Sequence, residues 1–169
     1  MKTPTTGAIL SAPDYRDGIA SASVLGAAAA QSLPSTFESD LTKFPVLDQN
    51  KIPACVGHAF ALLMQIYWYK KTGQIVRFSP RFLDILSSED WIPLDGGRVP
   101  RTVAKIAAKY GCCTVDMLPN NTDGLSLAAY RSKSAITDAM RNQAAQFKVG
   151  GYVRVENERV SDYRYAIQT

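Results

Sequence analysis

A glutamine and a cysteine near the end of the first third of the chain have types and spacing that could do chemistry. Gln49 stands six residues before Cys55, and Cys55 opens an apolar stretch with helical spacing. A thiol at a helix N-terminus lies at the positive end of the helix dipole, which favours the nucleophilic thiolate. A nearby amide can donate to the oxyanion that forms when a thiolate attacks a carbonyl carbon. The pair therefore indicates a cysteine nucleophile with an oxyanion donor, while a small core residue is the common alternative for a free cysteine.

No base for Cys55 is evident. His58 is the single histidine of the chain, three residues after Cys55 on the same expected helix, where the two side chains could be neighbours. We interpret His58 as a packed, hydrogen-bonded core histidine, and an enzyme that pairs Cys55 with His58 is the alternative. Cys112 and Cys113 are interpreted as core residues, because no second cysteine or histidine pair supports a zinc site. We expect neither a metal ion nor a cofactor.

Three helices in succession are expected to position these side chains. The first runs from Cys55 to Lys71 and stops at Gly73. The second starts at Ser79-Pro80, a capping hydroxyl before a proline at the first helical position, and continues to Leu86. The third starts at Pro100 and stops at Gly111. Three short helices predict a helical lobe.

The segments on either side of the three helices carry weaker signals. Residues 1–44 are rich in Ser, Thr, Ala, Pro and Gly, which predicts an extended arm with at most a short helix near 20–31. After the third helix the pattern predicts a short strand over 114–117, a helix over 134–146, strand-like alternation over 147–155 and a helix beginning at Ser161.

Composition excludes several classes of protein. Of the 169 residues 46% are hydrophobic and 20% charged, which is typical of a folded globular domain and excludes a disordered or membrane-spanning chain. The net charge of +4 is spread along the chain, so no nucleic-acid partner is expected. Three cysteines, two of them adjacent, do not suggest a disulfide framework. The N-terminus lacks the apolar core of a secretory signal, which predicts a cytoplasmic, intracellular protein.

Eight short motifs along the chain resemble those of the papain-like cysteine peptidases, the C1 family, and in particular the compact bacterial and phage-type members without a long inhibitory propeptide. They occur in the family's order: Pro13-Asp14-Tyr15-Arg16-Asp17, Leu33-Pro34, Asp48-Gln49, Cys55-Val56-Gly57-His58-Ala59, Ser79-Pro80-Arg81-Phe82, Asp95-Gly96-Gly97, Tyr110-Gly111 and Leu118-Pro119.

The resemblance implies a site and an activity. Cys55 would be the nucleophile of a thiol endopeptidase that works through an acyl-enzyme, and Gln49 with the Cys55 backbone amide would form the oxyanion hole. Gly96 and Gly97 would pair their backbone with an extended peptide or protein substrate, although an ordinary turn is the alternative for these two glycines.

The same resemblance implies the fold and its parts. The expected class is α+β, with an N-terminal arm over 1–44, a helical lobe carrying the Gln/Cys motif over 45–125, and only the first part of a β lobe over 126–169. In papain-like enzymes the base follows the nucleophile by roughly 130 to 150 residues. The resemblance therefore implies a chain truncated before the catalytic histidine, inactive alone, whose base comes from beyond Thr169 or from another chain.

A protein of a different class remains the alternative. A peptidase-like scaffold without activity would serve assembly, for example as a component of a phage virion or tail. Loss of the β lobe would leave an apolar face of the helical lobe uncovered, so this hypothesis predicts that a neighbouring protein covers it.

Overall fold

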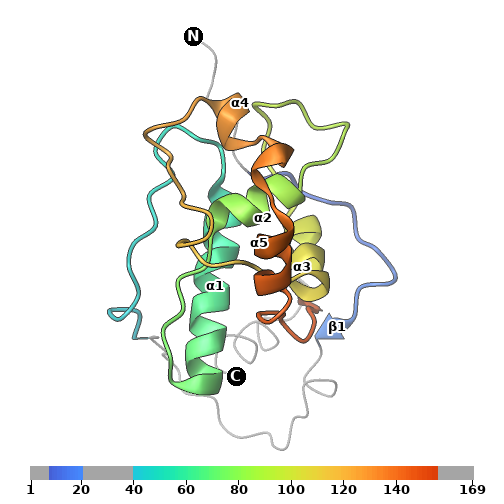
Figure 1. Ribbon diagram of the computed structural model, residues 1–169. Coiled ribbons are helices and arrows are strands. Elements are labelled where there is room, and N and C mark those ends of the chain that lie inside the picture. Colours follow the sequence, from blue (N-terminus) through green and yellow to red (C-terminus); the bar gives the residue numbers. More distant parts are fainter. Residues whose placement is uncertain (1–7, 21–39, 156–169) are drawn as a thin grey trace, which may run out of the picture. The chain divides into compact units, whose positions relative to one another are not determined.

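The computed structural model describes residues 8–20 and 40–155, shown as the coloured ribbon in Figure 1. The chain divides into two compact units, one of Met1–Ser11 with Phe44–Gly151 and the other of Ala12–Lys43 with Tyr152–Thr169. All candidate site residues belong to the first unit. Most of the expected arm, its helix near 20–31 and the helix expected from Ser161 lie outside the described residues.

The first helix of the lobe, α1, spans Cys55–Thr72. It ends at Gly73, whose φ of 73° lies in the left-handed region and whose N–H donates to the Tyr69 carbonyl at 2.8 Å. Glycine adopts this conformation at little cost, which explains why the helix stops there. The side chains of α1 that turn inward include Val56, Ala61 and Met64, which lie in the hydrophobic core. The expected helix is thus confirmed.

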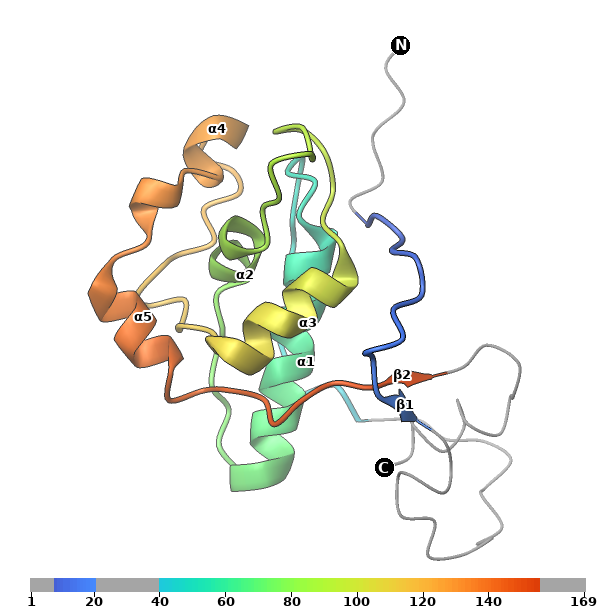
Figure 2. The same cartoon turned by 90° about the vertical axis from the view of Figure 1, so that its right-hand side faces the viewer.

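Two shorter helices pack against α1. Helix α2 spans Pro80–Leu86 and is capped by Ser79, whose Oγ accepts from the Phe82 N–H at 3.2 Å. Helix α3 spans Pro100–Lys109 and also begins with a proline. Both α2 and α3 contact α1 and each other, and the three form the centre of the unit in Figures 1 and 2. Between them lies a core whose least exposed members include Phe82, Leu83, Val103, Cys112 and Cys113, all 0% exposed.

The segment after α3 is helical but differs from the expected pattern. The strand expected over 114–117 is a single bridge between Phe78 and Thr114, followed by a turn. Helix α4, Leu127–Tyr130, was not expected.

The helix expected over 134–146 is also shorter than the pattern predicts, and a 3-10 turn, η1, Lys133–Ala135, precedes it. The observed helix is α5, Asp138–Ala144. It begins there because Thr137 has an extended backbone and caps the helix, its Oγ1 accepting from the Met140 N–H at 3.3 Å.

Strands are few in the described residues. Strands β1, Ile19–Ala20, and β2, Arg154–Val155, form a parallel pair within the second unit (Figure 2). The strand expected over 147–155 is therefore confined to its last two residues. The described helices are compatible with the expected helical lobe, while the α+β class and the β lobe expected over 126–169 stay predictions. No helix among the described residues is both long and apolar enough to span a bilayer.

Candidate active site

Cys55 is the first residue of α1, a free cysteine that is partly exposed as a residue and packs against the hydrophobic core. A compact loop, defined here as residues 48–54, leads into it. The Asn50 N–H donates to Asp48 Oδ1 at 2.7 Å, and Asn50 has a left-handed φ of 48°. The Ile52 N–H then donates to the Gln49 carbonyl at 3.0 Å. Loop 48–54 thus holds Gln49 in a hydrogen-bonded turn, partly exposed like Cys55.

His58 is buried one turn along α1, with 6% of its surface exposed. Its Nδ1 lies 2.8 Å from the Ala54 carbonyl, an acceptor, so this nitrogen carries the proton. Its Nε2 lies 2.9 Å from Asn120 Nδ2, a donor, and is therefore the unprotonated acceptor. Removal from water lowers the pKa of the imidazole. Both nitrogens are engaged, which confirms the core histidine and leaves His58 without a free nitrogen to act as a base for Cys55.

Asn120 connects His58 to loop 48–54 and to α4. Its Nδ2 also lies 3.3 Å from the Asp48 carbonyl, and its Oδ1 accepts from the Tyr130 hydroxyl at 3.0 Å. Two acceptors on the nitrogen and a donor on the oxygen fix the orientation of the amide. We call this set of contacts the Asn120 bridge. Because His58 holds Ala54 and Asn120 holds Asp48, the bridge ties down both ends of the loop that precedes Cys55.

Sequence reasoning did not find the Asn120 bridge. Asn120 lies in the run Pro119–Gly124, whose residue types signal only a turn. Tyr130 stands ten residues later, in a helix that no pattern indicated.

Gly96 and Gly97 are both buried. The Gly96 N–H donates to the Pro93 carbonyl at 2.8 Å, and the Gly96 carbonyl accepts from Arg131 Nη1 at 2.7 Å. A Cβ on Gly96 would lie 2.7 Å from Ile92 Cγ2, so packing alone requires glycine there. The backbone of Gly96 is therefore used within the chain, and pairing of the two glycines with a peptide stays a prediction.

A buried ion cluster lies behind the site. Asp84 of α2, which is 0% exposed, accepts from Arg131 Nε at 2.9 Å and lies 3.3 Å from Arg98 Nη2. Arg131 Nη2 donates to the Pro53 carbonyl at 2.8 Å. One carboxylate thereby fixes two guanidiniums, and through Arg131 it supports both loop 48–54 and the Gly96 turn.

Cys112 and Cys113 belong to the core, as predicted. Burial raises the pKa of the Cys112 thiol well above its ordinary value and that of Cys113 to about 12. Neutral thiols in a dry core neither attack carbonyl carbons nor bind metals. In the described part of the chain, no group of three or more His, Cys, Asp or Glu residues could hold a metal ion.

Comparison with known proteins identifies the fold. No protein-family model matches the sequence, and no curated protein matches it either. Among solved structures the chain is similar to xylellain, a cysteine protease from Xylella fastidiosa, with a TM-score of 0.76 and 22% sequence identity. The match covers 99% of this chain and 65% of that chain. The chain has a papain-like fold. It spans 65% of the length of its structural neighbour, and assignment to the C1 family or to a bacterial or phage type stays a prediction.

Proposed function

We propose that these residues form the nucleophile-bearing part of a papain-like cysteine peptidase. The thiolate of Cys55 attacks the carbonyl carbon of a peptide bond, and the carbonyl oxygen becomes an oxyanion. The Gln49 amide and the Cys55 backbone N–H donate to this oxyanion. The C–N bond then breaks, the amine leaves with a proton from a general acid, and water hydrolyses the thioester on Cys55.

One observation supports this proposal most. Cys55 is a free, partly exposed residue at the first position of an 18-residue helix, in a fold shared with a cysteine protease. The first backbone N–H groups of a helix have no partner within it and point towards a developing anion. The other two cysteines are buried, so Cys55 is the cysteine best placed to meet a substrate.

The proton-transfer partner lies outside residues 1–169 in this proposal. His58 is the single histidine, and both of its nitrogens are engaged with Ala54 and Asn120. The base would come from sequence beyond Thr169 or from another chain. Gly96 and Gly97 would lie along the path of an extended substrate, the role that the resemblance gives them.

Peptide hydrolysis by the natural protein that carries this sequence tests the proposal. Cys55→Ala removes the sulfur that forms the acyl-enzyme and is expected to abolish cleavage. Gln49→Ala removes one oxyanion donor and is expected to lower kcat by about 10²- to 10³-fold with the thiol still present. Lys51→Ala, an exposed change in the same loop, is the matched control and should leave kcat unchanged.

Cleavage retained by Cys55→Ala would show that another group is the nucleophile. If Gln49→Ala and Lys51→Ala behave alike, Gln49 is not the oxyanion donor. Neither the fold nor the comparison supports the alternative of a phage virion or tail component.

A further inference from the structure

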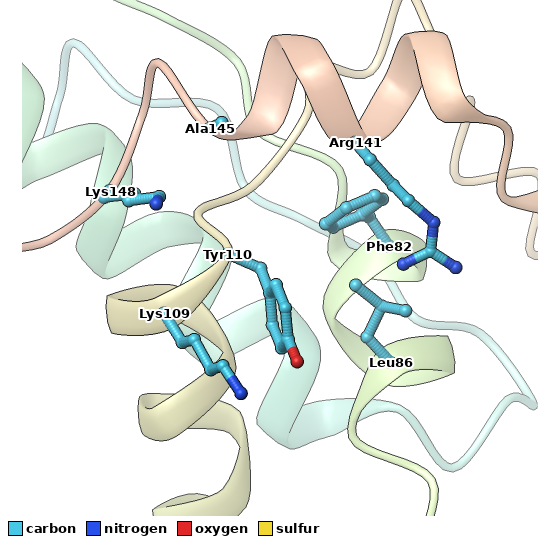
Figure 3. Close-up of a pocket in the computed structure, with 7 residues that line it drawn as sticks. All are labelled: Phe82, Leu86, Lys109, Tyr110, Arg141, Ala145 and Lys148. Atoms are coloured by element: carbon cyan, nitrogen blue, oxygen red, sulfur yellow. The ribbon is translucent and has the colours of Figure 1, made fainter.

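A small pocket lies between the C-terminal parts of three helices. It has a volume of about 140 Å³ and is lined by Phe82 and Leu86 of α2, by Lys109 and Tyr110 at the end of α3, and by Arg141, Ala145 and Lys148 at and after the end of α5 (Figure 3). None of these residues belongs to loop 48–54, to the Asn120 bridge or to the glycine pair. The pocket is therefore separate from the candidate active site.

The lining combines apolar surface with positive charge. Phe82 is 0% exposed and Leu86 is partly buried, so one side of the pocket is hydrocarbon. The Tyr110 ring faces these two side chains across the pocket and remains 43% exposed (Figure 3). Three cations, Lys109, Arg141 and Lys148, stand around it, and no carboxylate lines it. Within residues 8–20 and 40–155, none of the three forms an ion pair.

Helix ends explain only part of this charge. Lys109 and Arg141 lie in the last turns of α3 and α5, where a cation compensates the negative end of the helix dipole. Each such end amounts to roughly half a negative charge, so the ends of α2, α3 and α5 together offset about one and a half of the three positive charges. The pocket therefore keeps a net positive charge of about one to two.

Size and lining define the chemical class of a ligand. A water molecule occupies about 30 Å³ in the liquid, so a pocket of about 140 Å³ has room for a group of about five non-hydrogen atoms. An apolar group of that size would contact Leu86 and the Tyr110 ring, while its anionic end would meet one of the cations, which stand on different sides of the pocket (Figure 3).

We propose that this pocket binds a carboxylate carried on a short, branched apolar group. Two sources offer this chemistry: a free short-chain carboxylic acid, and the C-terminal carboxylate of a peptide that ends in leucine. The site does not depend on the activity proposed for Cys55.

Titration of the ¹⁵N-labelled chain with 4-methylpentanoate tests the proposal, because this acid is leucine without its amino group. Saturable shifts are expected at the amides of Leu86, Tyr110 and Ala145. The uncharged 4-methylpentanamide is expected to bind more weakly, and added NaCl is expected to weaken binding of the acid because exposed charges are screened. A second arm compares Ala-Ala-Leu with its C-terminal amide: saturation by the peptide acid assigns the site to C-termini, and saturation by the free acid alone assigns it to small molecules.

Variants distinguish binding in the pocket from general electrostatic attraction of the acid to a basic surface. Arg141→Gln and Lys148→Gln are each expected to weaken binding by about two- to fivefold. Lys105→Gln, an exposed lysine of α3 outside the pocket, is the matched control and should change nothing. The proposal is wrong if the amide binds as well as the acid, if Lys105→Gln has the effect of Lys148→Gln, or if no ligand saturates the chain up to about 20 mM.

Discussion

At the scale of single residues, His58 shows how surroundings decide the role of a reactive side chain. Its place one turn after Cys55 would allow a catalytic pair. Instead, Nδ1 donates to the Ala54 carbonyl and Nε2 accepts from the Asn120 amide, which fixes the neutral imidazole in the core. Burial away from water lowers the pKa of His58, so the folded state resists its protonation. A proton added to Nε2 would also face the N–H groups of Asn120 and remove a partly buried hydrogen bond.

This resistance predicts a pH dependence of stability. Above the ordinary histidine pKa of 6.5 both the folded and the unfolded chain hold His58 neutral, so its stabilising contribution is complete. Below that value His58 of the unfolded chain binds a proton, whereas His58 of the folded chain stays neutral. The free energy of unfolding should then fall by up to about 1.4 kcal/mol per pH unit, until the lowered pKa of the folded state is reached.

Urea unfolding from about pH 7.5 to about pH 5.5 measures this slope. His58→Asn, which cannot titrate, is the control, and its stability should fall less steeply over that range. Equal slopes in the two proteins would contradict the argument.

Sequence reasoning succeeded where a residue's role depends on its close neighbours along the chain. The start of a helix at Cys55, the cap at Ser79 and the stop at Gly73 are local signals, and the structure has all three. Asn120 and Tyr130 act through partners on other elements, His58 lying 62 residues from Asn120, and no pattern in one sequence reveals such a contact. The glycine pair is intermediate, because the turn was expected and the contact of Gly96 with Arg131 was not.

At the scale of elements, loop 48–54 is the part whose geometry the proposed chemistry needs most. Loop 48–54 has a left-handed residue at Asn50, and the segment after α3 holds it through the Asn120 bridge and through the bond from Asn50 Nδ2 to Thr122 Oγ1 at 2.8 Å. Helix α4 thereby contributes to the site although it carries none of the residues proposed to react.

Asn120→Ala should loosen this loop. The change leaves His58 Nε2, the Tyr130 hydroxyl and the Asp48 carbonyl without their shared partner, and one buried unsatisfied group costs about 1 to 3 kcal/mol. Amide hydrogen exchange at Ile52 and Ala54 should become faster by about tenfold or more, since a factor of ten corresponds to about 1.4 kcal/mol. Exposed Asn142→Ala is the control. Unchanged exchange at Ile52 and Ala54, with faster exchange elsewhere, would show that the bridge stabilises the fold without holding the loop.

At the scale of the whole unit, the buried ion cluster joins segments that are far apart in the sequence. Asp84 lies 14 residues from Arg98 and 47 from Arg131, so each charge looks like a solvated surface residue when the sequence is read locally. The cluster holds more positive than negative charge, and backbone carbonyls accept the remaining donors. Arg98 donates to the Asp84 and Gly97 carbonyls, and Arg131 to those of Pro53, Leu94 and Gly96.

Asp84→Asn therefore should cost far more than an ordinary loss of one charge. The amide keeps the shape of the side chain but leaves two guanidiniums, each at most 2% exposed, without a counterion. Breaking a buried pair in this way costs about 3 to 5 kcal/mol, because the remaining charge stays out of water. Exposed Asp116→Asn should stay within about 0.5 kcal/mol of the parent. The free energies of unfolding in urea measure both changes. A loss below about 1 kcal/mol for Asp84→Asn would mean that the carbonyls alone satisfy Arg98 and Arg131, and that the carboxylate is not what holds the segments around the candidate site together.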